Sequence, residues 1–125
     1  MDSGSMGREY VDQEVVCRQG EIGNCMFVVL AGRLSVFREE DGAERLVGEL
    51  EGGEVFGEMA ILDHGPRSAT VRARGKARVL TLDKQAFLKR VREDPQLALR
   101  IMQQMSGRIR RLNDELSLAL GQPRE

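Results

Sequence analysis

The sequence predicts a mainly β protein with C-terminal helices: a jelly-roll-like β-roll of about eight short strands, with one short helix inside it and two helices after it. Two observations predict this class. Ten of the 14 glycines lie between Gly20 and Gly75, where they separate short apolar runs rich in β-forming residues. After residue 82 the apolar spacing changes to three and four, as in helices. With 125 residues, the chain can bury roughly two-thirds of its unfolded surface.

The predicted strands are short runs of apolar or alternating residues bounded by turn residues. Asp41-Gly42 is a typical hairpin dipeptide and predicts that the runs on either side of it pair. Gly75 and Lys76 are expected to separate a second pair of strands in the same way. The runs are residues 14–18, 26–30, 34–38, 45–50, 68–74 and 78–82.

Two helices are predicted in the last third of the chain. Asp83 is an expected N-cap for a helix over 83–93, and Asp94-Pro95 is a second start signal, for a helix over 95–120. The second helix is long for so small a domain. It is expected either to pack on the β-core or to face a partner, and a homodimer through its apolar stripe is left open. That stripe is Ala98, Ile101, Met105, Ile109, Leu112, Leu116 and Ala119.

One domain is expected over 11–125, after a leader or truncated element over 1–10. Its parts are a β-roll over 11–82 and the two helices. No apolar run approaches the 18 residues that a membrane helix needs, and residues 1–7 lack the features of a signal peptide. A cytoplasmic location is therefore expected, with Cys17 and Cys25 as reduced thiols.

Charge and composition argue against several functions. The net charge is −1, so no global field favours nucleic acid or an anionic membrane. A basic stretch over 67–92 and an acidic stretch over 39–58 are expected to offset each other on the surface, and nucleic-acid binding is not expected. A single histidine, His64, and no evident nucleophile–base pair argue against a metal-dependent or hydrolytic enzyme.

The segment 52–71 is the most informative part of the sequence. Gly57 permits a backbone turn with positive φ or a close approach to a ligand. Residues 58–62 can form a turn of helix whose first amides could hold an anion, and the planar guanidinium of Arg67 suits a phosphate. Glu58 would repel a phosphate, so it must contact something else, such as a sugar hydroxyl, or pair with an arginine. This pattern indicates a site for a phosphate and a ribose.

The same residues resemble the phosphate-binding cassette of the cyclic nucleotide-binding domain family. The pattern is matched at Phe56-Gly57-Glu58-Met59-Ala60 and at Arg67-Ser68-Ala69. Residues 20–34 are similar to the family's early strand–turn–strand glycine framework, and the resemblance covers roughly 11–118. It implies a β-roll followed by two helices, and a cyclic nucleotide as ligand.

The resemblance also implies a role for each cassette residue. An Arg equivalent to Arg67 pairs with the cyclic phosphate, and a Glu equivalent to Glu58 bonds the ribose 2′-hydroxyl. Backbone amides around Met59 and Ala60, with the Ser68 hydroxyl, complete the phosphate contacts. The implied ligand is cyclic AMP or cyclic GMP, with no cofactor and no metal. Ser68 does not decide between them, and cyclic AMP is preferred. The implied binding set in this segment is Gly57, Glu58, Met59, Ala60, Arg67, Ser68 and Ala69.

The base contact is expected from the last helix. In channel members of the family an arginine on this helix stacks over the purine, and the spacing from Pro95 places Arg108 there. Two alternatives stay open: Arg108 is a solvated helix residue, or Asn113 contacts the base instead. The expected function is a sensor that couples nucleotide binding to movement of the C-terminal helices, through an unidentified effector. The alternative is an interaction module with a vestigial pocket.

Overall fold

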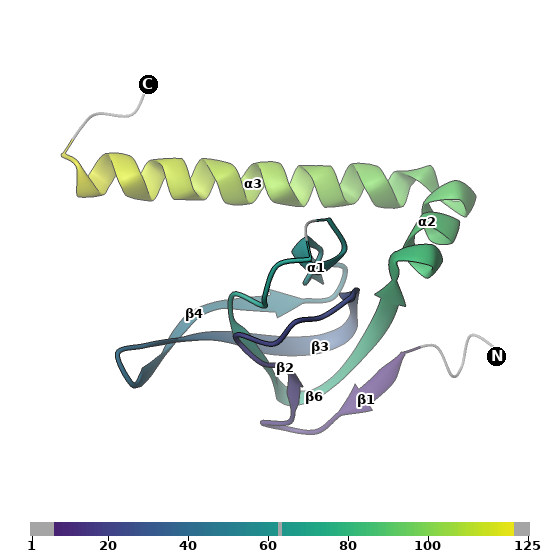
Figure 1. The fold of residues 1–125 in the computed structure, drawn as a ribbon, viewed down its shortest axis with the longest axis horizontal. Coiled ribbons are helices and arrows are strands. Elements are labelled where there is room, and N and C mark those ends of the chain that lie inside the picture. Colours follow the sequence, from purple (N-terminus) through teal and green to yellow (C-terminus); the bar gives the residue numbers. More distant parts are fainter. Residues whose placement is uncertain (1–6, 63, 122–125) are drawn as a thin grey trace. The chain divides into compact units, whose positions relative to one another are not determined.

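A computed structural model describes residues 7–62 and 64–121 of the chain (Figure 1). The chain divides into two compact units, with the boundary between Leu88 and Lys89. Among the described residues, the first unit holds all of the strands and one short helix, and the boundary falls within the helix Lys84–Glu93. The second holds the long C-terminal helix.

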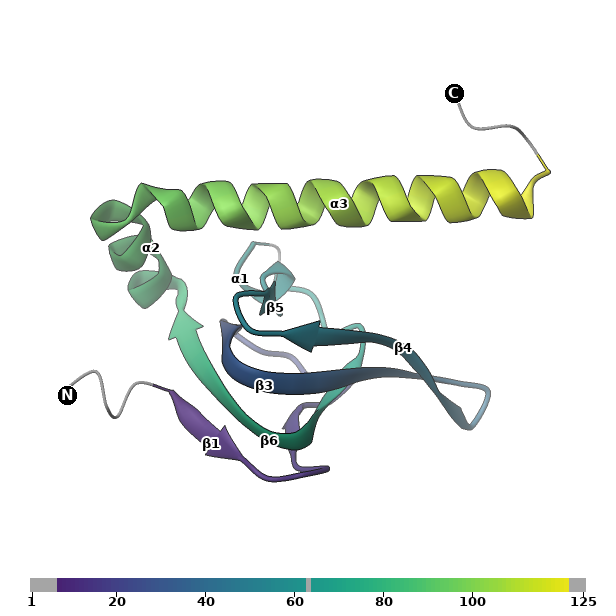
Figure 2. The ribbon, with the colours of Figure 1, turned by 180° about the vertical axis from the view of Figure 1, so that it is seen from behind.

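The first unit is built on one antiparallel sheet, which confirms the predicted mainly β class (Figure 1). Four strands follow each other across the sheet in the order β1-β6-β3-β4, while β2 pairs with β6 and β5 pairs with β3. The long central strands β3 and β6 are curved (Figure 2). The strands are β1 (Arg8–Tyr10), β2 (Val15–Cys17), β3 (Cys25–Glu40), β4 (Ala43–Glu51), β5 (Val55–Phe56) and β6 (Thr70–Asp83).

The β3–β4 hairpin forms where the sequence predicts it. Asp41 and Gly42 have φ of 55° and 81°, so both central residues of the turn are left-handed. This is the backbone of a type I′ turn, which matches the twist of the flanking strands. Pairing runs from Glu40↔Ala43 to Arg33↔Glu51, with one irregularity after Val36.

The predicted pairing around Gly75 is wrong. Residues 68–74 and 78–82 do not turn back on each other, because β6 runs through Gly75 as one strand and pairs with β3 along both halves. The runs 26–30 and 34–38 are likewise joined in β3. Gly32 allows the two long strands to bend together, since a Cβ there would collide with the carbonyl of Lys76. Four predicted short strands are therefore parts of two long, bent strands.

The sheet also begins earlier than expected. Arg8–Tyr10 forms β1 and pairs with residues 77–79 of β6, inside the segment expected as a leader. Tyr10 is buried in the core. A strand of three residues is too short to show a period of two, so the sequence pattern does not reveal it.

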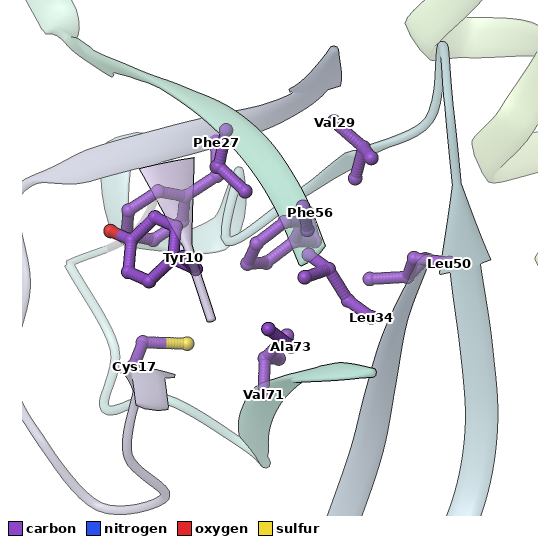
Figure 3. Packing of buried hydrophobic residues seen from close by; sticks show 11 residues of the cluster. Tyr10, Cys17, Phe27, Val29, Leu34, Leu50, Phe56, Val71 and Ala73 are labelled. Carbon is purple, nitrogen blue, oxygen red and sulfur yellow. The ribbon is translucent and has the colours of Figure 1, made fainter. Parts of the chain in front are cut away.

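The core lies between the curved strands of the first unit (Figure 3). The rings of Phe27 and Phe56 stack at its centre, with centroids 4.9 Å apart and planes 20° apart. This contact joins β3 to the strand that precedes the predicted phosphate-binding segment. The cluster is Tyr10, Cys17, Phe27, Val29, Leu34, Leu50, Phe56, Val71, Ala73, Ala77 and Val79.

Three helices are present among the described residues: α1 (Met59–Leu62), α2 (Lys84–Glu93) and α3 (Pro95–Ala119). Both predicted N-caps are confirmed. The Asp83 carboxylate accepts a hydrogen bond from the Ala86 amide at 2.7 Å, and the Asp94 carboxylate accepts one from the Gln96 amide at 3.1 Å. In the part of the chain that the structure describes, no helix is both long and apolar enough to cross a membrane.

Candidate ligand-binding site

The segment 57–69, here called the cassette, is fixed at both ends to the chain around 20–28. At its start, Phe56 of β5 pairs with Phe27 of β3. At its end, Arg67 donates its amide to the Glu21 carbonyl at 2.8 Å and accepts the Gly20 amide at 2.8 Å. Two regions that are distant in the sequence therefore form one frame around the Arg67 side chain.

The guanidinium of Arg67 is held inside this frame. The residue is only 9% exposed. Its Nη1 donates to the Gly57 carbonyl at 3.2 Å, and its Nη2 donates to the Cys25 carbonyl at 2.9 Å. Nη2 also lies 3.5 Å from the Cys25 Sγ, and the guanidinium carbon is 5.0 Å from the centre of the Phe27 ring.

All of these partners are neutral. Within its own unit, no carboxylate among the described residues forms an ion pair with Arg67. A buried charge normally needs an opposite charge, because losing water is costly for an ion. The arrangement therefore favours an anion that approaches Arg67 from outside the fold.

Two glycines make room for this side chain. Gly57 has φ of +75°, which confirms the predicted positive φ, and a Cβ there would fall on Nη1 of Arg67. Gly23 has an ordinary φ, but a Cβ on it would also overlap the guanidinium. The sequence analysis did not assign Gly23, Cys25 or Phe27 to the site. Their positions in the glycine framework over 20–34 are the one signal that could have pointed to them.

Glu58 and the short helix α1 follow Gly57 directly. Glu58 is 6% exposed, and Ala60 is buried, whereas Met59 is about half exposed. The Ala60 amide donates to the Gly57 carbonyl at 3.2 Å and the Ile61 amide donates to the Glu58 carbonyl at 3.0 Å, which closes the single turn of α1. The predicted short helix is thus present, beginning one residue after Glu58.

The remaining predicted residues lie in two places. Ser68 is exposed and Ala69 is half-buried, between Arg67 and the first residue of β6. Arg108 belongs to the second unit, where it is half-buried on α3, and Asn113 is exposed on the same helix. The structure brings Gly57 and Arg67 into direct contact. Arg108 stays a prediction.

The two cysteines are free thiols near this frame. Burial raises the pKa of the Cys17 thiol above its usual value of 9.0, and the positive charge of Arg67 opposes that shift only in part. In residues 7–62 and 64–121, no three His, Cys, Asp or Glu side chains are grouped so that they could hold a metal ion.

The buried Arg67 guanidinium, bonded to neutral carbonyls beside Gly57, makes this β-roll a candidate anion-binding domain. The family model described as "Cyclic nucleotide-binding domain" matches residues 7–94. The chain therefore belongs to the cyclic nucleotide-binding domain family. The match includes the whole cassette and ends at the start of α3.

Individual relatives agree with this assignment. A cAMP-dependent protein kinase regulatory subunit of Mucor circinelloides is 40% identical over 78 residues, which is 62% of this chain and 18% of the relative. The cyclic AMP receptor protein of Thermus thermophilus is 33% identical over 112 residues, covering 89% of this chain and 52% of the relative. The crystal structure of Thermus thermophilus catabolite activator protein has a TM-score of 0.78 and 33% identity, and covers 90% of this chain and 53% of that one. The chain thus spans about half or less of each of these proteins.

Proposed function

We propose that this chain is a sensor domain that binds a cyclic nucleotide, cyclic AMP in preference to cyclic GMP, in the cassette. The proposal rests on the environment of the Arg67 guanidinium, which is buried and bonded to neutral carbonyls. Among the described residues of its own unit, no carboxylate forms an ion pair with it. A cyclic phosphate would supply the missing negative charge. Arginine is well suited to this because its planar fork can bond two phosphate oxygens at once.

The neighbouring residues of the cassette complete the phosphate contacts in this proposal. Gly57 has no side chain beside the guanidinium, so a ligand could approach the backbone closely. The amide of Met59 and the exposed hydroxyl of Ser68 would donate to the phosphate oxygens. The Ala60 amide, which donates to the Gly57 carbonyl in this structure, would exchange that bond for one to the phosphate. Ala69, small and half-buried, would line the site without filling it.

Glu58 would bind the ribose. Its carboxylate can only accept hydrogen bonds when ionised, so it fits the 2′-hydroxyl and not the phosphate. A cyclic nucleotide offers that hydroxyl because its cyclic phosphate occupies the 3′ and 5′ positions. Together, Glu58 and Arg67 would select a ligand with an anionic phosphate and a free 2′-hydroxyl.

We also propose that ligand binding is coupled to the C-terminal helices. Arg108 would lie over the purine when the ligand is bound, with Asn113 as the alternative contact. The cassette and α3 belong to different units of the chain, so in this proposal binding in the first unit would act on the second. A ligand shifts such an equilibrium only by its differential affinity for the two arrangements. The preference for cyclic AMP is supported by two relatives, a cAMP-dependent protein kinase regulatory subunit and a cyclic AMP receptor protein.

In this proposal the chain is a cytoplasmic regulator and not an enzyme, and the domain predicted over 11–125 begins instead with β1. It binds no nucleic acid itself and acts on a partner. One candidate partner is a second copy of the chain, bound through α3 in a homodimer. Ile109, Leu112 and Leu116 recur there at spacings of three and four and are more than half exposed. An effector domain is the other.

Calorimetric titration tests the proposal. The chain would be unfolded and refolded to remove bound nucleotide and then titrated with cyclic AMP, cyclic GMP and 5′-AMP. We expect cyclic AMP to bind most tightly and 5′-AMP most weakly. If none of the three binds, the chain is instead an interaction module with a vestigial pocket.

A further inference from the structure

We propose that Phe27 is a positioning residue for Arg67: its ring holds the guanidinium plane in the orientation that a phosphate needs. This inference rests on the proposed function, since it assigns a role within the same site. Phe27 touches no ligand in this account. It acts only through Arg67.

The ring of Phe27 is itself fixed. Phe27 is 5% exposed, stacks on Phe56 at 4.9 Å, and is paired along its backbone with Phe56 and Thr81. A Cβ on Gly57 would lie 3.2 Å from the ring edge, so the cassette backbone passes close beside it. A ring without freedom of its own can restrict the group that lies over it.

The contact between this ring and Arg67 complements the hydrogen bonds. The carbonyls of Cys25 and Gly57 bind the edge of the guanidinium at Nη2 and Nη1, while the ring attracts the cation as a whole, with 5.0 Å between the guanidinium carbon and the ring centre. A free arginine side chain has many rotamers, which a ligand would have to order on binding. Restricting the guanidinium beforehand raises affinity, because less freedom is lost when the phosphate arrives.

The same strand carries a matched contact with a different role. Arg72 lies 4.8 Å from the centre of the Phe37 ring, but its guanidinium bonds both oxygens of Glu44 at 2.7 Å. There the arginine charge is already neutralised. Among the described residues, three arginines lie over aromatic rings. Of these, only Arg67, over Phe27, has no carboxylate partner within its own unit. Position 37 is therefore a control for position 27.

The decisive experiment replaces each ring in turn by 3,5-difluorophenylalanine, introduced at that single position. Fluorine weakens the attraction of the ring for a cation and changes its shape little. We expect affinity for cyclic AMP to fall about three- to tenfold at position 27 and to stay within about twofold at position 37. Phe27→Leu should also lower the affinity for cyclic AMP, and Phe37→Leu should not. Unchanged or higher affinity with the fluorinated ring at position 27 would overturn the proposal.

A second measurement needs no ligand. A proton held over an aromatic face resonates upfield, so the Arg67 side-chain N–H signals should be shifted in the wild type and return toward ordinary values in Phe27→Leu. If the wild type binds no cyclic nucleotide, the proposed function fails, while this signal still reports on the Phe27–Arg67 contact. If the wild type binds and the signals do not depend on Phe27, only the positioning role fails.

Discussion

Arg67 and Cys25, 42 residues apart in the sequence, are in contact through both the backbone and the side chain of the cysteine. The guanidinium donates to the Cys25 carbonyl at 2.9 Å and lies 3.5 Å from its sulfur. This contact ties the end of the cassette to the first residue of β3. It explains how a loop with only one turn of helix can hold a charged side chain in a defined place.

The steric role of Gly23 gives a prediction that does not depend on removing any polar group. Gly23→Ala places a Cβ where the guanidinium now lies, at a position whose φ is ordinary. Affinity for cyclic AMP should fall at least about tenfold, or about 1.4 kcal/mol, because Arg67 must move. Calorimetry would measure it. Gly52→Ala is the matched control, since a Cβ there meets only the Leu30 carbonyl at an ordinary distance of 3.7 Å. Equal affinities for the two variants would show that Arg67 is not confined as described.

Glu58 is expected to recognise the 2′-hydroxyl. For the wild type, 2′-deoxy cyclic AMP should bind about ten- to a hundredfold more weakly than cyclic AMP, since a hydrogen bond to a charged group is worth about 1.5–3 kcal/mol. Glu58→Gln should reduce this preference, and Glu58→Ala should abolish it. Competition binding with the two nucleotides would measure both ratios. A mutant that still discriminates as the wild type does would assign the ribose contact to another residue.

Parts of the fold and of the site could be predicted from the sequence because they depend on local chemistry. The turn at Asp41-Gly42, the caps at Asp83 and Asp94, and the left-handed Gly57 each follow from a few neighbouring residues. The cassette arginine could be identified from its pattern alone.

The features of the fold and of the site that could not be predicted from the sequence depend on contacts between distant segments. A glycine at position 75 is compatible with a hairpin or with a bend, and only the pairing of β6 along the whole of β3 decides. In the same way, the glycine framework over 20–34 contains Gly23 and Phe27 but does not indicate that Arg67 packs against them. These residues come together only when β3 and the cassette are paired.

Cys17 should make the protein less stable in alkali. Burial raises the pKa of its thiol above 9.0 in the folded state, so above that pH the folded protein retains a proton that the unfolded chain releases. The contribution of the Cys17 thiol to the free energy of unfolding is therefore fully present below about pH 9 and is lost as the pH rises through the folded-state pKa. Urea unfolding at about pH 8 and about pH 10 would measure this loss. Cys17→Ala should reduce the difference between the two pH values, and an undiminished difference would assign it to other groups.

The exposed face of α3 predicts a dimer. Leu112→Glu should give a monomer in sedimentation experiments, because it places a charge in the proposed apolar seam. Leu118→Glu changes an equally apolar residue outside the seam, 81% exposed, and should leave the dimer intact. A wild-type chain that sediments as a monomer with and without cyclic AMP would exclude the dimer and leave an effector domain as the partner.

Removal of the Arg67 guanidinium tests most directly whether it binds the phosphate of a cyclic nucleotide. The measurement is calorimetric titration of nucleotide-free wild type and Arg67→Ala with cyclic AMP. Arg72→Ala serves as the control, since it removes an arginine already paired with Glu44. We expect the wild type and Arg72→Ala to bind with similar affinity. Arg67→Ala should lose about 2–5 kcal/mol, or about thirtyfold to several thousandfold in affinity. Binding of cyclic AMP to Arg67→Ala as tight as to the wild type would contradict the account.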